Sequence, residues 1–414
     1  MRTVTKTLLA LLVLSLSGCL KDRTTKTYTL FKPVYEKKET VLKSIKSGSD
    51  QPLEKPGKMY VYGPYLLVNE INEGVHVFNI ADAAKPVNQA FIRIPGNLDI
   101  AVRGNILYAD IYSDMLTLDI SDPQNAKLLN NYPNVFPERV YSNGFMADST
   151  QYIVGWEQRD TTVTIDDTAP CFWCGPMPGM WLDYAQVNSL GSSGSKAPIG
   201  VAGSMARFSV VDQFLYLVND NSLQAYDISA PAAPAKSGDP LFMGAQLETI
   251  YPFGDKLFIG ATTGMFICDI SASGQPVLVG QAAHFRVCDP VITDGNFAYV
   301  TLRSSAVCGT VIESQLQVMD VRDVRSPSLL KKLPLSDPYG LGKWDNLLWV
   351  CDGEAGLKIF DVSTPAAPVL KQEFKNINPF DVIPLGQVVV VSAKEGVFLY
   401  DCSDPGNIHL ASKI

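Results

Sequence analysis

The chain of 414 residues is 46% apolar and 18% charged, and it contains 31 Gly and 27 Pro. This composition excludes a disordered chain, which has fewer apolar residues, and a coiled coil, which has far fewer Gly and Pro. The formal net charge of −8 argues against a nucleic-acid partner, because an acidic protein repels phosphates.

The first 18 residues have the order of a secretory signal peptide. Arg2 and Lys6 precede the apolar run 8–16, which is too short to cross a bilayer as a stable helix. The sequence Leu-Ser-Gly-Cys at 16–19 resembles a bacterial lipobox. The resemblance implies cleavage before Cys19 and a membrane anchor through lipid on its thiol. The alternative is an ordinary cleaved signal that contains a cysteine.

Two further features concern the location of the protein. Leu20 stands where inner-membrane lipoproteins of enteric bacteria carry Asp, which favours the outer membrane, with periplasmic or surface display. Residues 20–57 contain nine basic and five acidic residues, whereas residues 58–414 contain 23 basic and 37 acidic ones. We therefore expect a lipid-anchored basic tether at 19–57 followed by an acidic body. The tether either lies against anionic lipid or is a solvated linker.

One segment recurs along the body with a period near 40 residues. Typical copies are Leu-Thr-Leu-Asp-Ile-Ser-Asp-Pro at 116–123 and Leu-Lys-Ile-Phe-Asp-Val-Ser-Thr-Pro at 357–365. The aligned polar residues of the eight copies are Asn79, Asp119, Asp166, Asp227, Asp269, Asp320, Asp361 and Asp401. Each copy is expected to be a strand, with a strand pair upstream and a fourth strand downstream. Four short strands in each 40 residues predict an all-β fold, a β-propeller at 58–414.

The repeated strand resembles that of the LVIVD repeat proteins, and the resemblance covers about residues 58–414. Lipid-anchored members of this family in Bacteroidota-type bacteria resemble the whole chain. The resemblance implies the architecture and brings no settled activity with it. Eight upstream strand pairs favour eight blades, and seven blades remain if the divergent third copy, 163–170, does not close.

The repeated aspartate has a structural interpretation that we prefer to a metal site. In a propeller these positions lie in the outer half of separate blades, too far apart to share an ion. The Asp-x-Ser spacing instead predicts that each carboxylate accepts a backbone amide hydrogen of the following turn.

A second set of residues aligns at the start of the innermost strands, which line the channel of a propeller. The set consists of Lys58, Asp99, Arg139, Arg207, Glu248, Asp289 and Asp381, with Gly340 in the remaining copy. One interpretation is a ring of ion pairs that closes the channel. The other is a binding site at the channel mouth, where the basic residues bind an anionic group and the acidic ones bind a cation or sugar hydroxyls.

The sixth repeat carries a long insertion at 304–314 on the same face. Antiparallel strands bring Cys288 near Cys308, so we expect a disulfide there in an exported protein. His284, Arg286 and Arg303 would surround it as a second candidate binding locus. The alternative is a long loop that the disulfide only stabilises, without a binding role.

The third repeat is followed by Cys-Phe-Trp-Cys-Gly-Pro-Met-Pro-Gly-Met-Trp at 171–181. The motif resembles a thioredoxin site, but Met177 stands at the position of the second thiol. We therefore expect a local disulfide between Cys171 and Cys174. This insertion either binds a partner or folds back over the blade. The sequence does not decide on which face of the propeller it lies. A zinc site is not expected, because the chain has only three His and no second Cys-x-x-Cys pair.

The sequence favours a lipid-anchored binding or scaffolding module over an enzyme. No nucleophile elbow, phosphate-binding loop or calcium-loop spacing is present, and no cofactor or metal is implied. The expected contacts are an envelope protein or a small polar ligand at the channel mouth. The alternative is a periplasmic propeller enzyme, hydrolase- or lactonase-like, with His284 and Asp289 as an acid/base pair.

Overall fold

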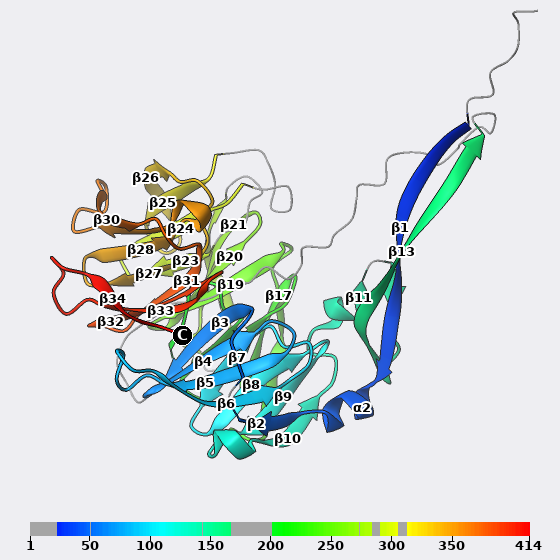
Figure 1. Cartoon of the computed structure of the whole chain (residues 1–414). Coiled ribbons are helices and arrows are strands. Elements are labelled where there is room, and N and C mark those ends of the chain that lie inside the picture. The colour runs from blue at the N-terminus through cyan, green and yellow to red at the C-terminus, as the bar shows by residue number, and fades with distance from the viewer. Residues whose placement is uncertain are drawn as a thin grey trace, which may run out of the picture.

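The computed structural model describes residues 23–49, 51–142, 144–166, 201–272, 274–283, 290–304 and 313–414. It is an all-β propeller in which seven antiparallel four-stranded sheets, the blades, surround a centre (Figure 1). We name the strands of each blade A to D from the centre outward. Within the described ranges, no helix has the length and apolar character needed to cross a membrane.

The strands follow one another along the chain, so each blade is one continuous segment. The first three blades are β3 (Pro56–Tyr62), β4 (Tyr65–Glu70), β5 (Gly74–Asn79) and β6 (Val87–Arg93); β7 (Ile100–Arg103), β8 (Ile106–Ile111), β9 (Asp114–Asp119) and β10 (Lys127–Tyr132); and β15 (Phe208–Val211), β16 (Phe214–Val218), β17 (Ser222–Asp227) and β18 (Ala235–Phe242). The fourth and fifth are β19 (Leu247–Phe253), β20 (Lys256–Ala261), β21 (Gly264–Asp269) and β22 (Val277–Ala283); and β23 (Val291–Thr293), β24 (Phe297–Leu302), β25 (Gln315–Asp320) and β26 (Ser328–Pro334). The last two are β27 (Leu341–Trp344), β28 (Leu347–Cys351), β29 (Leu357–Asp361) and β30 (Val369–Phe374); and β31 (Pro379–Pro384), β32 (Val388–Ala393), β33 (Gly396–Asp401) and β34 (His409–Lys413).

The third repeat does not form a blade, so the count is seven rather than the favoured eight. Residues 163–166 of the third copy lie in β13 (Gln151–Asp166), and 167–170 lie outside the described residues. β13 pairs with β1 (Arg23–Lys37) in a two-stranded ribbon that projects from the propeller (Figure 1). Asp166 is opposite Arg23 in this ribbon. The third copy therefore takes its partner strand from the predicted tether. A short hairpin, β11 (Tyr141–Ser142) and β12 (Phe145–Met146), precedes β13.

The rest of the predicted tether also has a defined structure. The helix α2 (Lys38–Lys43) follows β1, and β2 (Lys46–Gly48) then pairs with β6 as an added outer strand of the first blade. The described residues also contain three short 3-10 helices: η1 (Pro123–Asn125), η2 (Pro137–Val140) and η3 (Gly353–Ala355).

The repeated aspartate has the predicted structural role in all seven blades. The side-chain oxygen accepts the backbone amide of the residue two positions later in every C to D turn, as between Asp361 and Ser363 at 2.9 Å. The amide between them donates to the A to B turn of the same blade, at 2.7–2.9 Å, as from Val362 to Asn346. The Asp-x-Ser motif therefore fastens the two turns of one face together.

Each outermost strand is bent by a bulge. The register between the C and D strands shifts once in all seven blades. A bulge increases the twist and disturbs the row of unpaired backbone groups, so it hinders the outer edge of a blade from pairing with other chains.

Tyrosine hydroxyls and apolar packing join neighbouring blades. Tyr60 donates to the carbonyl of Val102 at 3.1 Å, and Tyr251 donates to that of Thr293 at 3.3 Å. Burial raises the pKa of both phenols. The first and last blades exchange no strand in the described residues. Apolar side chains such as Met59 and Ile383 and a hydrogen bond from Ser392 to Gly57 close the ring.

We predict that Asp269→Ala lowers the free energy of unfolding by about 1 kcal/mol at pH 7, because the amide and hydroxyl of Ser271 lose their acceptor. Asp269→Asn keeps a side-chain oxygen as acceptor and should lower the free energy of unfolding less. The side-chain oxygen of Asn79 is the natural acceptor at the same position of the first blade. The hydrogen bonds to Ser271 lower the pKa of Asp269 to about 2. The contribution of this carboxylate is therefore complete above pH 4 and is lost as the pH falls toward 2. Denaturant unfolding at pH 7 and pH 3 measures both effects, and an equal deficit of Asp269→Ala at the two pH values would contradict the assignment.

Candidate functional site

The A strands of the blades begin at one edge of the propeller, on the face formed by the D to A and B to C connections. We call this the mouth face. The structure places Lys58 in β3, Glu248 in β19, Asp381 in β31, and Asp99 and Arg207 directly before β7 and β15. Arg139 lies in η2, between the second and third blades, because its repeat forms no blade. Asp289 lies outside the described residues.

Lys58, Asp99 and the backbone of Arg207 meet at the centre. One carboxylate oxygen of Asp99 accepts from Nζ of Lys58 at 2.5 Å and from the amide of Arg207 at 2.6 Å, and the other accepts from the amide of Ile100 at 2.8 Å. The Lys58 and Asp99 residues are 5% and 3% exposed. Burial lowers the pKa of Lys58 and raises that of Asp99, and their ion pair opposes both shifts. The pair joins three blades in a site with little access for solvent.

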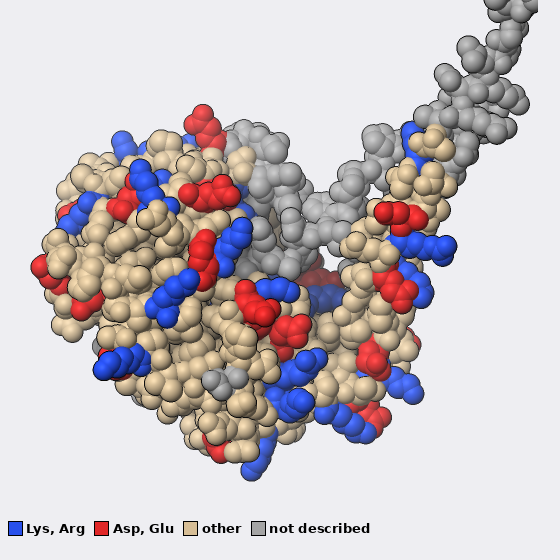
Figure 2. Space-filling view, in the orientation of Figure 1, with Lys and Arg blue, Asp and Glu red and all other residues tan. Residues whose placement is uncertain are grey.

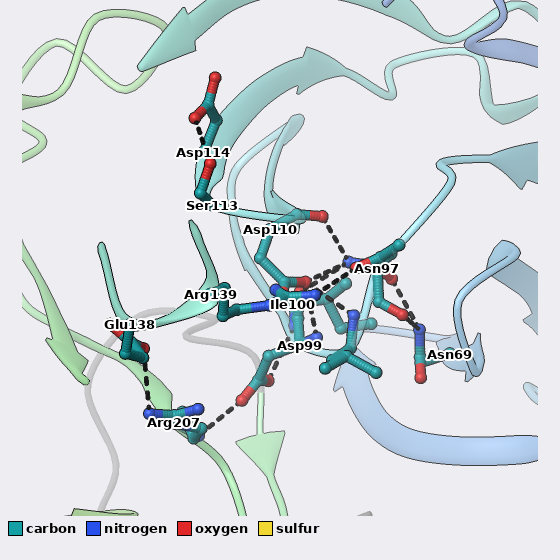
Figure 3. Close-up of polar contacts among 12 residues, drawn as sticks. Asn69, Asn97, Asp99, Ile100, Asp110, Ser113, Asp114, Glu138, Arg139 and Arg207 are labelled. Carbon is teal, nitrogen blue, oxygen red and sulfur yellow. Dashed lines mark hydrogen bonds and ion pairs between the residues drawn. The ribbon is translucent and has the colours of Figure 1, made fainter. Parts of the chain in front are cut away.

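A second buried carboxylate, Asp110 of β8, holds Arg139 on the second blade (Figure 3). Its Oδ1 accepts from Nδ2 of Asn97 at 2.7 Å and from the amide of Asp99 at 2.9 Å, and its Oδ2 forms the ion pair with Arg139. The guanidinium of Arg139 also donates to the carbonyl of Gly96 at 2.8 Å. Although Arg139 belongs to no blade, this network brings it to the predicted ring.

The side chain of Arg207 points from the centre toward two acids. Its Nη2 lies 3.6 Å from Oε1 of Glu138 and 3.8 Å from Oδ1 of Asp220. The side chains of Arg207, Glu138 and Asp220 are 20%, 16% and 42% exposed. Burial is the main cause that raises the pKa of Glu138. With Arg139 and Glu248, which are also partly exposed, these residues form a rim of mixed charge on the mouth face.

Residues 201–207, which we call the hub segment, cross the centre of the propeller. β14 (Val201–Ala202) pairs with the inner edge of β3. Oγ of Ser204 then accepts from the amide of Leu341 at 2.8 Å, and the carbonyl of Ala206 accepts from the amide of Ile250 at 2.7 Å. Together with the bond from Arg207 to Asp99, these contacts reach the first, second, fourth and sixth blades. Sequence reasoning missed this segment, although the small residues of Ala-Gly-Ser-Met-Ala at 202–206 suit a crowded axis.

The hub segment also explains why one repeat has glycine in the charged ring. A Cβ atom on Gly340 would lie 2.7 Å from Oδ1 of Asp381 and 3.1 Å from Oγ of Ser204. No side chain fits there. Asp381 itself is fully buried. At Lys58, Asp99 and Asp381 the structure therefore matches the closed ring better than an open pocket, whereas the rim is accessible.

Sequence reasoning also missed a polar cluster at the base of the ribbon. The fully buried carboxylate of Asp114 accepts from Lys38 at 2.8 Å, from the hydroxyl of Tyr152 at 2.8 Å and from the amide of Asn134 at 3.0 Å. Burial alone would raise the pKa of Asp114, but the amide of Asn134, the ammonium of Lys38 and the other donors lower it. The cluster ties both ribbon strands to the second blade. No motif marked Asp114, because its partners come from distant segments.

The loops of the sixth repeat now belong to the fifth blade. Arg303 is 8% exposed and its guanidinium stacks 4.2 Å above the ring centre of Tyr339. His284, Arg286, Cys288 and Cys308 lie outside the described residues, as do Cys171 and Cys174. The two disulfides and the acid/base pair therefore stay predictions.

Further titratable groups in the described part of the chain include His76 and three cysteines. His76 is buried between Phe78 and Phe91, 3.3 Å from a carboxylate oxygen of Glu70. Cys268 and Cys351 are buried free thiols, and Cys402 is a half-buried one. In the described ranges, no group of three or more His, Cys, Asp or Glu side chains is arranged to hold a metal ion.

We predict that Lys58→Met lowers the free energy of unfolding by about 3–5 kcal/mol, because it leaves the Asp99 carboxylate buried without its cation. The double variant Lys58→Met/Asp99→Asn should be more stable than the single variant, since no buried charge is then unpaired. Denaturant unfolding of wild type, both single variants and the double variant gives the coupling energy. Additive losses would show that the pair is not coupled.

Comparison with known proteins identifies the repeat. The LVIVD repeat model matches residues 97–133, 202–239 and 345–376, which lie mainly in the second, third and sixth blades. A search of curated sequences found no match. A solved protein from Lactobacillus plantarum has a similar structure, with a TM-score of 0.55 at 14% identity over 86% of this chain and 96% of that one. The computationally designed Ika8 protein has a TM-score of 0.51 at 10% identity over 87% of both chains.

Identities this low show a common fold and nothing about activity. The repeat match and the seven observed blades agree with each other. The chain is a seven-bladed β-propeller that carries LVIVD repeats.

Proposed function

We propose that this protein is a binding module of the bacterial envelope, anchored through lipid on Cys19, which contacts its partner on the mouth face. The observation that carries the proposal is the β1–β13 ribbon, which projects from the propeller and begins at Arg23, four residues after Cys19 (Figure 1). At about 3.3 Å per residue, the 15 residues of β1 span roughly 50 Å. The lipid is thus held apart from its own propeller.

The base of the ribbon supports a defined rather than a flexible connection. The buried Asp114 cluster joins the end of β1 to the second blade through Lys38 and to β13 through Tyr152. The amide of Lys38 also donates to the carbonyl of Thr150 at 2.9 Å. Because β1 is paired along its length and fixed at its base, it positions the mouth face relative to the anchor.

Charge gives weaker support for contact between the tether and lipid. Three of the basic residues of the tether form ion pairs: Lys32 with Glu157, Lys38 with Asp114 and Lys43 with Glu39. In the view of Figure 2, Lys and Arg are interspersed with Asp and Glu over both propeller and ribbon, without a face of one sign. The membrane attachment we propose therefore rests on the acyl chains rather than on a basic surface.

The rim of mixed charge on the mouth face is suited to a polar partner. Arg207 and Arg139 can pair with acidic groups, and Glu248, Glu138 and Asp220 can pair with basic ones. Partly exposed side chains can pair with a partner while they remain in contact with water, whereas the buried Lys58–Asp99 pair would have to be broken. The rim, and not the axis, is the surface that we propose for binding.

Lipid attachment is tested by Cys19→Ala. We expect wild type expressed with its own leader in a bacterial host to incorporate labelled palmitate and to enter the detergent phase of Triton X-114. Cys19→Ala should do neither. The matched control is Cys268→Ala, which removes a buried thiol and should leave both results unchanged. A Cys19→Ala chain that still carries label would overturn the anchor.

Binding at the mouth face is tested by photo-crosslinking in intact cells. A photoreactive residue at Glu248 should yield an adduct with an envelope component, and the same residue at Asn105, in an A to B turn on the opposite face, should not. Arg207→Ala should weaken the Glu248 adduct severalfold while the fold is kept, because the bond to Asp99 comes from the Arg207 backbone. Adducts from Asn105 alone would move the binding surface to the opposite face.

A further inference from the structure

The ribbon leaves long strand edges unpaired. β1 and β13 form a sheet of two strands only, and neither pairs with a third strand in the described part of the chain. Residues 157–160 of β13 are exposed. Two strands alone are marginally stable in water, and a long free edge is a template for another strand. The ribbon therefore has the features of a sheet that is completed by a partner.

The two edges differ in their capacity to accept a strand. β1 contains Pro33, which has no backbone N–H, and proline on an edge hinders further pairing. β13 contains no proline over its 16 residues. The free edge of β13 is therefore the better place for an additional strand.

The sequence of β13 is complementary to itself in one antiparallel register. When two copies align about Gln158, Glu157 of each copy stands opposite Arg159 of the other, and Trp156 stands opposite Asp160. β13 bulges at Val154, between Ile153 and Gly155, so this register pairs the regular stretch 155–161 of the two copies, with Gln158 at its centre. We propose that two copies of this chain associate through β13 in this register and form a four-stranded sheet ordered β1-β13-β13-β1.

The charges on one face of the ribbon extend across the proposed interface. Lys32 is opposite Glu157 within one chain, with Nζ 2.9 Å from Oε2, and both side chains are exposed. Residues opposite each other in antiparallel strands point to the same face, so Arg159 of the second copy would flank Glu157 on its other side. Each Glu157 then lies between two cations.

The overall shape permits this association. The interface is the same on both copies, as in a twofold dimer. Because the ribbon projects from the propeller (Figure 1), antiparallel ribbons place the two propellers at opposite ends of the shared sheet. The contacts come from the ribbons and not from the rim residues Arg207, Glu138, Asp220 and Glu248, so the association is tested separately from the binding function proposed above.

The register is tested by disulfide trapping in the full-length chain, in intact cells treated with a mild oxidant. In Gln158→Cys the two Cα atoms at the twofold axis are expected at about 4.5–5.5 Å, within the range of a disulfide. In Thr161→Cys the two cysteines are expected about 20 Å apart. We expect a reducible dimer from Gln158→Cys and little from Thr161→Cys. Wild type is the control for crosslinking through the native cysteines, and we expect little dimer from it as well. Equal dimer from both variants, none from either, or an adduct with a different protein would overturn the proposal.

The charge pairs are tested separately by the dimer fraction of the detergent-solubilised chain in light scattering. Arg159→Glu places acids opposite each other twice in the dimer, and we expect the association to weaken about tenfold. The triple variant Lys32→Glu/Glu157→Arg/Arg159→Glu reverses every sign and should restore it. A triple variant as weak as Arg159→Glu, or a single variant as strong as wild type, would contradict the register.

Discussion

The fold depends on hydrogen bonds for the polar backbone groups at the centre of the ring. In the described residues, the first and last blades exchange no strand. Each A strand has an inner edge that no other strand of its own blade covers, and unpaired buried amides and carbonyls are costly. The hub segment meets this requirement, because its backbone and the hydroxyl of Ser204 bond to four blades. The carboxylate of Asp99 then joins the hub segment to Lys58, so the buried charge of Lys58 is paired.

This filled centre decides where function can lie. A propeller with an open channel can bind ligands on its axis, whereas here the axis is occupied by residues of the chain itself. Near the axis, the charged side chains that remain accessible are those of the rim, around Arg207 and Glu248. The other distinctive feature is the ribbon. Arg139 of the rim and β13 of the ribbon belong to the third repeat, whereas Arg207 and Glu248 belong to the blades that follow it. The divergent sequence of the third repeat corresponds to a different structure, because its strand β13 lies outside the ring, in the projecting ribbon.

Architecture could be predicted from local patterns, whereas most of the site could not. The Asp-x-Ser motif acts within two residues, so the Asx turn of Asp361 follows from the sequence, and the natural Asn79 fits the same role. In the blades that form, the start of the A strands also follows from the repeat, and Lys58 and Asp99 are in contact there, whereas Arg139 lies outside any blade. The burial of the Lys58–Asp99 pair could not be predicted, because it depends on the hub segment, which enters the centre after an insertion without repeat character.

The ribbon shows the same limit. Residues 19–57 were expected to form a tether, but β1 within them pairs with β13, more than 110 positions away. Residues 163–166 of β13 belong to the third copy of the repeat, which was expected to form a blade in an eight-bladed ring. Composition, spacing and the repeat by themselves determined an all-β chain of propeller blades, since each blade is local. Only the tertiary structure decided that there are seven blades, that Asp114 fixes the ribbon and that the centre is closed, because those results depend on contacts between segments that no local pattern relates.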